Sequence, residues 1–499
     1  MPRVMKTFRF YFLVLLSAAT ALRAADGAWT FDRLCAMAAE RAAVPYHDDS
    51  TPAPATLARL SYDDLRCIEF CREAAVWHAE HLPFEVMMYH PGGGYTQGVA
   101  LQLLEGGQPR SVPFNAGLFL YHQIPVATNE LPATLNYPGF RVVTELNQRG
   151  RFDEVISFLG ASYFRALGKG QTYGASARGI ALRPAAGQAE EFPRFTAFWV
   201  ERPERKMDEL RLFALLDGPS VCGAYQFVLK PGEDTTVQVR AALYARKILT
   251  NLGIGTLTSM FWHGKNSPDR CGDFRPEVHD SDGLLVADGD GTWRWRPLQN
   301  VAAVRDTNLP LGHLQGFGLF QRDRKFSNYQ DTEALYHRRP SVWVEPTGDW
   351  NTGRIRLTEL PAHGEYGDNV VACWEPVQPL TPGKPLNASW TLHWFMEDHM
   401  QPLMARCVNT FVAGRRILLD FAGGELHGVG DKPVAAQVSS DNGATRNLHV
   451  IANPDVGGWR VGFDVVPAET NRTTALSVTL RAAIGGQNLS ETWMYQLAL

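Results

Sequence analysis

The stretch Leu360–Trp374 reads Leu-Pro-Ala-His-Gly-Glu-Tyr-Gly-Asp-Asn-Val-Val-Ala-Cys-Trp and sets two acids on a loop that leads into an apolar segment. Its proline and two glycines argue against a helix, whereas Val370 and Trp374 suit a strand packed on a core. Glu365 and Asp368 therefore lie at a junction between a loop and a strand. Such junctions commonly present catalytic or binding groups, because the strand fixes the base of the loop. An ordinary acidic turn explains the same pattern, so this stretch alone leaves its function open.

Short apolar or alternating runs recur from Phe84 onward, separated by glycine, proline and aspartate. This texture predicts many antiparallel strands joined by turns, and no fixed repeat indicates a propeller or a solenoid. We therefore expect a mainly β protein with a large, curved β-sandwich over residues 25–395 and a groove across one face or edge. The runs are Phe84–Tyr89, Phe198–Glu201, Leu210–Leu216, Tyr225–Leu229, Thr236–Leu243, Trp293–Pro297, Gly318–Gln321 and Val342–Glu345.

A second domain is expected because 499 residues exceed the size at which one core usually stops growing. A proline-rich passage and a polar passage mark a linker, which we place at 396–403. Residues 404–499 carry strand-like runs in the number that an immunoglobulin-like sandwich uses, without its disulfide. Two helices are expected before the strands, at Phe31–Val44 and at Tyr62–Ala79.

The N terminus has basic residues, an apolar run from Phe10 to Leu22 and small residues at its end. This pattern predicts a Sec-type signal peptide over residues 1–24, cleaved after Ala24. The run is too short to be preferred as an anchor, and no later segment approaches about 18 uninterrupted apolar residues. We expect an exported protein with no stable membrane insertion.

The composition limits the classes of binding partner that we expect. A net charge of -4 gives no electrostatic reason to expect nucleic acid or an anionic membrane. The 13 Trp, 15 Tyr and 26 Phe residues supply many rings for stacking. Seven cysteines are too few for a dense disulfide framework, and Cys67 and Cys71 lack a second ligand pair. We expect no metal and no cofactor.

A second acidic turn spans Arg275–Gly283 and holds three acids and a histidine. Calcium would need alternating oxygen ligands and a terminal bidentate acid, and that spacing is absent. Acid–base chemistry and a solvated turn both remain open. His279 either tunes Asp280 or is a simple hydrogen-bonding partner.

Several longer motifs are spread over the chain. They are Leu159–Arg165, Tyr173–Arg178, Glu190–Phe195, Leu257–Phe261, Arg275–Asp280, Trp295–Leu298, Gln315–Leu319, Tyr336–Trp343, Gly367–Asn369 and Ser490–Trp493. In these motifs the chain resembles the periplasmic glucan biosynthesis protein G/D family (MdoG/OpgG and OpgD). The resemblance implies a galactose-mutarotase-like sandwich followed by an immunoglobulin-like domain. It also implies a periplasmic location and work on osmoregulated periplasmic glucans, whose backbone is β-1,2-linked glucose.

The resemblance also implies roles for single residues. Asp368 corresponds to the general acid, Asp280 to the acid on the water-activating side, and Tyr336 to a tyrosine of the substrate and proton-relay region. Inverting hydrolysis needs two such carboxyl groups about 6.5–9.5 Å apart, with the acid kept protonated by burial or by a nearby negative charge. Glu365 supplies that charge, is the acid itself, or is an exposed bystander.

Binding of a glucan calls for aromatic platforms under the apolar faces of the sugars and for polar groups at their edges. For each ring, packing in the core is the competing interpretation. The expected substrate-binding residues are Tyr163, Arg165, Phe261, Trp262, Trp343 and Glu365.

Three functions follow from these expectations. The first is an anomer-inverting endo-β-1,2-glucanase that shapes the glucan backbone. The second is a non-catalytic glucan-binding or assembly factor that works with an inner-membrane glucan synthase. A weaker third is an epimerase or lyase on the same scaffold, since a fold alone does not determine chemistry.

Overall fold

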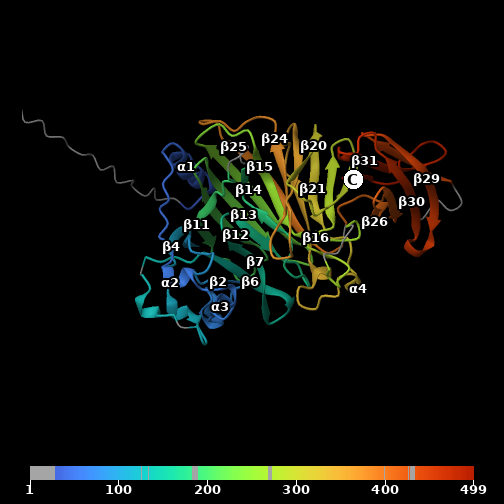
Figure 1. Ribbon diagram of the computed structural model, residues 1–499. Coiled ribbons are helices and arrows are strands. Elements are labelled where there is room, and N and C mark those ends of the chain that lie inside the picture. Colours follow the sequence, from blue (N-terminus) through green and yellow to red (C-terminus); the bar gives the residue numbers. More distant parts are fainter. Residues whose placement is uncertain are drawn as a thin grey trace, which may run out of the picture.

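The computed structural model describes residues 28–124, 126–132, 134–182, 189–267, 272–397, 399–424, 426 and 433–498. The expected signal peptide, residues 1–24, lies outside these described residues. Within them the chain is built mainly from β-strands, which confirms the expected mainly β sandwich class (Figure 1). No helix in this described part is long and apolar enough to cross a membrane.

The first large sheet is antiparallel at each of its strand pairs. Its spatial order is β2 (Phe84–Met88), β6 (Gly139–Gln148), β7 (Arg151–Leu159), β8 (Tyr163–Ala166), β9 (Ser176–Arg178), β15 (Leu252–Ser259), β24 (Val370–Pro376), β23 (Gly353–Glu359) and β20 (Arg305–Leu311), with β10 (Ala181–Leu182) paired to β15. The acidic loop that precedes β24 therefore lies at the end of a central strand.

The second large sheet runs through both halves of the molecule. Its order is β28 (Val434–Ser440), β31 (Thr474–Ala482), β32 (Thr492–Leu497), β19 (Trp293–Pro297), β18 (Gly283–Asp288), β21 (Leu314–Phe320), β22 (Ser341–Pro346), β25 (Leu386–Phe395), β14 (Thr235–Ala245), β13 (Val221–Lys230), β12 (Leu210–Asp217), β11 (Arg194–Glu201), β3 (Ala100–Glu105) and β4 (Gln108–Ser111). The parallel pairing of β19 with β32 joins the C-terminal strands to the main sheet.

The core lies between the two sheets, where aromatic rings from each sheet meet. Phe140 on β6 packs edge-on against Phe198 on β11, with ring centroids 5.0 Å apart. Phe158 on β7 meets Phe227 on β13 in the same way at 5.4 Å. All four side chains are buried. Burial of this apolar surface holds the sandwich together, because it removes the inner faces of both sheets from water.

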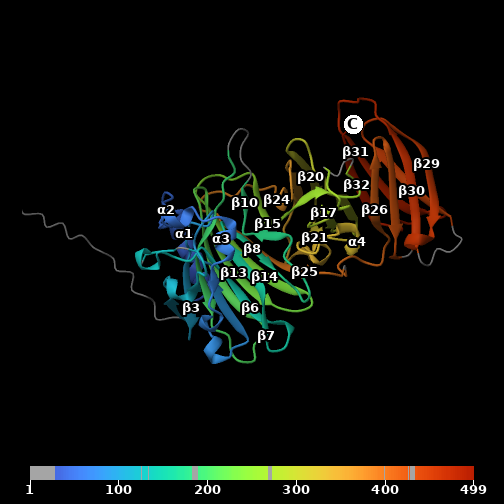
Figure 2. The same ribbon diagram turned by 60° about the horizontal axis from the view of Figure 1, so that its bottom comes forward.

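The C-terminal strands form a lobe at one end of the molecule (Figures 1 and 2). A four-stranded sheet has the order β26 (Arg406–Ala413), β27 (Arg416–Ala422), β30 (Gly458–Val466) and β29 (Ala444–Asn453). It shares a core with β28, β31 and β32 through Phe421, Phe463, Val478 and Trp493. The chain from β25 to β26 leads into this lobe and includes the expected linker at 396–403. The immunoglobulin-like and galactose-mutarotase-like assignments stay predictions.

Of the two expected helices, one forms as predicted. Helix α1 (Phe31–Ala42) packs its buried side chains on the outer face of the second sheet, beside Trp199 and Phe213. The helix expected at Tyr62–Ala79 is wrong beyond its first turn, because α3 ends at Arg66. Its Ser61 capping box is present.

The chain after α3 is extended because tertiary pairing outweighs helical spacing. Strand β1 (Glu69–Phe70) pairs with β5 (Phe119–Leu120), and this pairing buries Phe70. Trp77 has φ 70°, which an α-helix does not allow. The remaining short elements are α2 (Ala55–Ala58), η1 (Arg72–Ala74), η2 (His78–Glu80), η3 (Ala116–Leu118), η4 (Thr128–Glu130), β16 (Phe261–His263), β17 (Val278–His279), α4 (Phe326–Tyr329), η5 (Tyr336–Arg338) and η7 (Pro454–Val456).

Candidate functional site

Asn369 fixes the acidic loop between Leu360 and β24. Its side-chain Oδ1 accepts from the Phe261 amide at 2.8 Å, and its Nδ2 donates to the Phe261 carbonyl at 3.0 Å. The same Nδ2 donates to the Leu360 carbonyl at 3.1 Å, and the Leu360 amide donates to the Asn369 carbonyl at 2.8 Å. These bonds close the loop on itself. They hold Asp368 beside β15, where the Thr258 hydroxyl donates to its carboxylate at 3.0 Å.

Asp280 comes to the same place from the other acidic turn. Its amide donates to the Met260 carbonyl at 2.8 Å, and its carboxylate pairs with the Arg339 guanidinium. The residue is 4% exposed. Burial raises the pKa of Asp280, Arg339 opposes this effect, and the negative charge of Asp368 adds to it. The fold therefore brings the two predicted catalytic acids close enough to interact electrostatically.

Tyr336 links these acids to Glu365. Its hydroxyl donates to the Glu365 carboxylate, and the Arg339 guanidinium lies 4.3 Å from the centre of its ring. Burial and the bond to Glu365 raise the pKa of Tyr336, so the phenol keeps its proton at neutral pH. Glu365 in turn accepts two bonds from Arg275, at 2.8 Å and 3.1 Å. Three loops are thus joined by charge-assisted bonds (β17 and α4 mark this region in Figure 2).

A cavity of about 530 Å³ lies on the face of the first sheet, and two of its lining residues interact electrostatically with the acids. It is within the size range of sites for small organic ligands. Tyr163 and Arg165 on β8 line this cavity, and each interacts electrostatically with one of the two acids. Burial raises the pKa of Tyr163 and the charge of Asp368 adds to this, while Arg165 acts to lower the pKa of Asp280. Other lining residues are Tyr62, His90, Tyr95, Phe119, Arg141, Phe164 and Tyr173.

The remaining predicted binding residues have different places. Trp262 is half-buried and packs against the cluster that contains Tyr336. Phe261 is 2% exposed, and its ring stacks on His279 with centroids 5.2 Å apart. Trp343 is 4% exposed and stacks on Trp293 in the core of the C-terminal half. Both rings are therefore largely buried, and a direct contact of Phe261 or Trp343 with a sugar stays a prediction.

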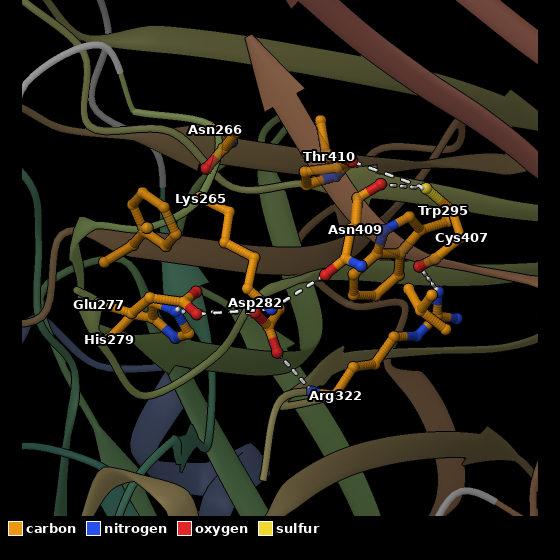
Figure 3. A pocket seen from close by; sticks show the side chains of 14 residues that line it. Lys265, Asn266, Glu277, His279, Asp282, Trp295, Arg322, Cys407, Asn409 and Thr410 are labelled. Atoms are coloured by element: carbon orange, nitrogen blue, oxygen red, sulfur yellow. Dashed lines mark hydrogen bonds and ion pairs between the residues drawn. The ribbon is translucent and has the colours of Figure 1, made fainter. Parts of the chain in front are cut away.

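A second, smaller polar cavity of about 40 Å³ separates the acidic turn from β26 (Figure 3). Possible ligand atoms of Glu277, His279 and Asp282 lie within 4.8 Å of one another there. Lys265 already pairs with Glu277 at 3.5 Å and donates to Asn409 at 3.0 Å. The cluster thus has a cation of its own, and its spacing alone does not assign a metal.

His279 is buried inside this cluster and bonded on both ring nitrogens. Its Nδ1 donates to the Gln321 side-chain oxygen at 2.9 Å, because the Gln321 amide nitrogen is committed to the carbonyls of His279 and Tyr336. Burial opposes protonation, but the neighbouring Asp282 and Glu277 outweigh it and raise the pKa of His279. The two carboxylates next to Asp280 thus favour protonation of His279.

Arg322 connects the acidic turn to the C-terminal lobe. Its guanidinium donates to Glu491 at 2.6 Å and 2.9 Å and to the Cys407 carbonyl at 3.0 Å. Its backbone amide donates to Asp282. Glu491 is 1% exposed, so this contact between the two halves is buried. The turn that carries Asp280 is therefore braced from the C-terminal side.

Sequence reasoning missed the groups that hold the acids in place. Arg339 and Asn369 lie inside motifs that were recognised, and Arg275 begins the acidic turn, but none was assigned to the site. A cation or an amide within a motif that also carries an acid is the signal for such a partner. The spacing of residues in the sequence does not tell which distant group such a cation or amide contacts in the fold.

Fold and site together define a two-lobed β-sandwich protein in which two loop carboxyl groups interact with each other and with residues of a cavity lined by aromatic rings and arginine. The sequence matches the family described as "Periplasmic glucan biosynthesis protein, MdoG" over residues 29–497. The chain belongs to this family.

Relatives of similar length support this membership. The chain is 40% identical to "Glucans biosynthesis protein G" of Ralstonia nicotianae, an alignment that covers 97% of this chain and 98% of the relative. It is 40% identical to the protein of the same name from Rhodopseudomonas palustris, over 92% and 91% of the two chains. It is also 39% identical to "Probable glucans biosynthesis protein D" of Shewanella oneidensis, over 89% and 84%.

Proposed function

We propose that this chain acts in glucan biosynthesis in the periplasm, as an anomer-inverting endo-β-1,2-glucanase that shapes the glucan backbone. The observation that carries the proposal is the electrostatic interaction of Asp280 with Asp368, from two separate loops, and of both acids with Arg165 and Tyr163 of the cavity of about 530 Å³. Inverting glycosidases use two carboxyl groups in this way, one as acid and one as base. The names of the relatives support the glucan as the substrate class.

In the proposed reaction the glucan chain lies along the cavity, over Tyr163 and Trp262. Asp368 is exposed, so its carboxyl group is open to a sugar of the bound chain. Asp368 then donates its proton to the glycosidic oxygen as the bond to the anomeric carbon breaks. The leaving chain departs with a new hydroxyl group.

Asp280 serves the other side of the reaction. Water attacks the anomeric carbon from the face opposite the leaving group and gives its proton to Asp280. The raised pKa makes this carboxylate a stronger base, while the Arg339 guanidinium favours its ionised form. Tyr336 and Glu365, which are hydrogen bonded to each other, orient the groups through which the proton moves from the water to Asp280. The product has the inverted configuration at the anomeric carbon.

A non-catalytic glucan-binding or assembly factor is the second candidate. One observation favours it: the Asp280 carboxylate is engaged by Arg339, and Tyr336 is engaged by Glu365. Groups held in this way also suit a rigid binding groove. In this version the chain receives nascent glucan from an inner-membrane synthase, and the C-terminal lobe is the docking module.

The test is incubation of the purified protein with linear β-1,2-glucan, with product size and anomeric configuration followed by NMR. We expect shorter products whose new ends have the α configuration. Asp368→Asn and Asp280→Asn should each lower the rate about 10²–10⁴-fold, whereas Asp290→Asn, in an exposed turn, should leave it unchanged. An Asp368→Asn protein as fast as wild type would remove the assigned acid. Binding without cleavage by wild type would favour the assembly factor.

A further inference from the structure

Several exposed aromatic rings of the described residues have contacts in or next to the candidate site. Tyr62 and Tyr95 line the cavity, and Phe192 shares the Arg178 guanidinium with Tyr163, at 4.9 Å and 5.0 Å. Phe326 lies edge-on to His337, the neighbour of Tyr336. The exposed Tyr and Phe side chains are Tyr62, Tyr95, Phe192, Phe274, Phe326 and Tyr366. Single exposed rings are ordinary on a protein surface, so an exposed ring is informative only where a further contact ties it to a site.

The two most exposed of these rings flank one ion pair. Tyr366 is 97% exposed and Phe274 is 79% exposed. Phe274 precedes Arg275 and Tyr366 follows Glu365, and these two charged residues are joined by paired bonds of 2.8 Å and 3.1 Å. The ion pair therefore holds together the two loops that carry these rings. We call these two residues the aromatic rim.

The aromatic rim is tied to the acids but lies outside the cavity. Glu365 accepts from the Tyr336 hydroxyl, and Tyr366 stands two positions before Asp368. Neither rim residue is among those that line the cavity. Arg275 also pairs with Asp273 and with Asp331, both at 2.7 Å, so the loop under Phe274 is anchored at several points.

We propose that Phe274 and Tyr366 bind glucose rings of the same glucan chain outside the cavity, next to the acids. This inference rests on the proposed glucan chemistry. Glucose presents apolar C–H faces that stack on aromatic rings, and the two exposed rings of the aromatic rim offer such faces next to the acids. Because the ion pair already holds the two loops together, little ordering entropy is lost when a sugar binds.

The proposal sets the length of the preferred substrate. A short oligosaccharide fills the cavity alone, whereas a longer chain passes the acids and reaches the aromatic rim. The affinity of wild type should therefore continue to rise with chain length after the cavity is full. A chain bound on both sides of the acids is cut internally, which is what endo action requires.

The experiment measures binding of β-1,2-linked oligosaccharides of increasing length by calorimetry, starting from the disaccharide. It uses catalytically impaired Asp368→Asn protein with and without Phe274→Ala and Tyr366→Ala together. We expect the double alanine change to weaken long chains about tenfold, equal to about 1.4 kcal/mol, and to leave short chains within twofold. Phe274→Tyr with Tyr366→Phe should keep the long-chain affinity. Ile484→Ala, which is exposed on the C-terminal lobe, is the unrelated surface control.

Three outcomes separate this inference from the proposed function. Equal affinity of the rim variant and its parent for every length overturns the rim while glucan binding stands. An equal loss for short and long chains also overturns it, since the rings would then act through the loop that holds Asp368. Failure of wild type and of the Asp368→Asn parent to bind any β-1,2-glucan overturns the proposed function itself. Both rings are exposed, so the melting temperature should not change.

Discussion

Replacement of Asn369 by alanine is expected to loosen the acidic loop and to slow glucan cleavage. The Asn369 side chain is buried, with 4% of the residue exposed, and it makes three hydrogen bonds to backbone groups. Two of these bonds go to Phe261 and one to Leu360. Alanine removes all three hydrogen bonds, including the two that the Asn369 side chain makes with the amide and the carbonyl of Phe261.

The size of the effect follows from those bonds. A hydrogen bond within a protein contributes about 1 kcal/mol net, so three bonds amount to about 3 kcal/mol. Buried backbone groups left without a partner cost about 1–3 kcal/mol each, so about 3 kcal/mol is a lower figure unless water enters. Because Asp368 precedes Asn369, we also expect the rate to fall more than about tenfold, as a shift of about 1 Å at a catalytic group can cost 10²-fold.

Urea unfolding and the rate of glucan cleavage measure the two effects separately. Asn387→Ala is the matched control, because Asn387 is an exposed asparagine on β25 and should change stability by less than about 0.5 kcal/mol. An Asn369→Ala protein that matches wild type in both measurements would refute the reasoning. A loss of stability with no loss of rate would show that the bonds support the sheet but not the position of Asp368.

Two further predictions concern buried charges. Asp280→Asn should raise the melting temperature near neutral pH but not below about pH 4. The reason is that the folded state raises the pKa of Asp280, so stability is lost as pH rises through that pKa and the carboxyl group ionises. Melting curves over a range of pH test this, and a difference that does not depend on pH would contradict it. Glu491→Ala should cost about 3–5 kcal/mol, since it removes the buried carboxylate that pairs with Arg322 between the two halves. Urea unfolding tests it against exposed Glu469→Ala, and equal stability of the two variants would mean that the contact contributes little.

Local sequence patterns predicted many of the strands, and they failed where a segment is buried by pairing with a part of the chain that is distant in sequence. The runs at Leu210–Leu216 and Thr236–Leu243 became β12 and β14, because alternation and turn residues are properties of neighbouring positions. The segment after Arg66 has helical spacing but becomes β1, since Phe70 gains more by pairing with β5. The parallel contact of β19 with β32 was not expected at all.

The sequence by itself determined the mainly β class, the two acidic loops and, through its motifs, the family. Only the tertiary structure decided which side chains meet. Asp280 and Asp368 are 88 positions apart (368 − 280 = 88). They come together because both loops are bonded to the chain at the end of β15: the Asp280 amide donates to the Met260 carbonyl, and the Asn369 side chain accepts from the Phe261 amide. The same folding buries Trp343 and Phe261 and leaves Phe274 and Tyr366 in water. Burial and pairing depend on strand register and packing between distant segments, and no local spacing records them.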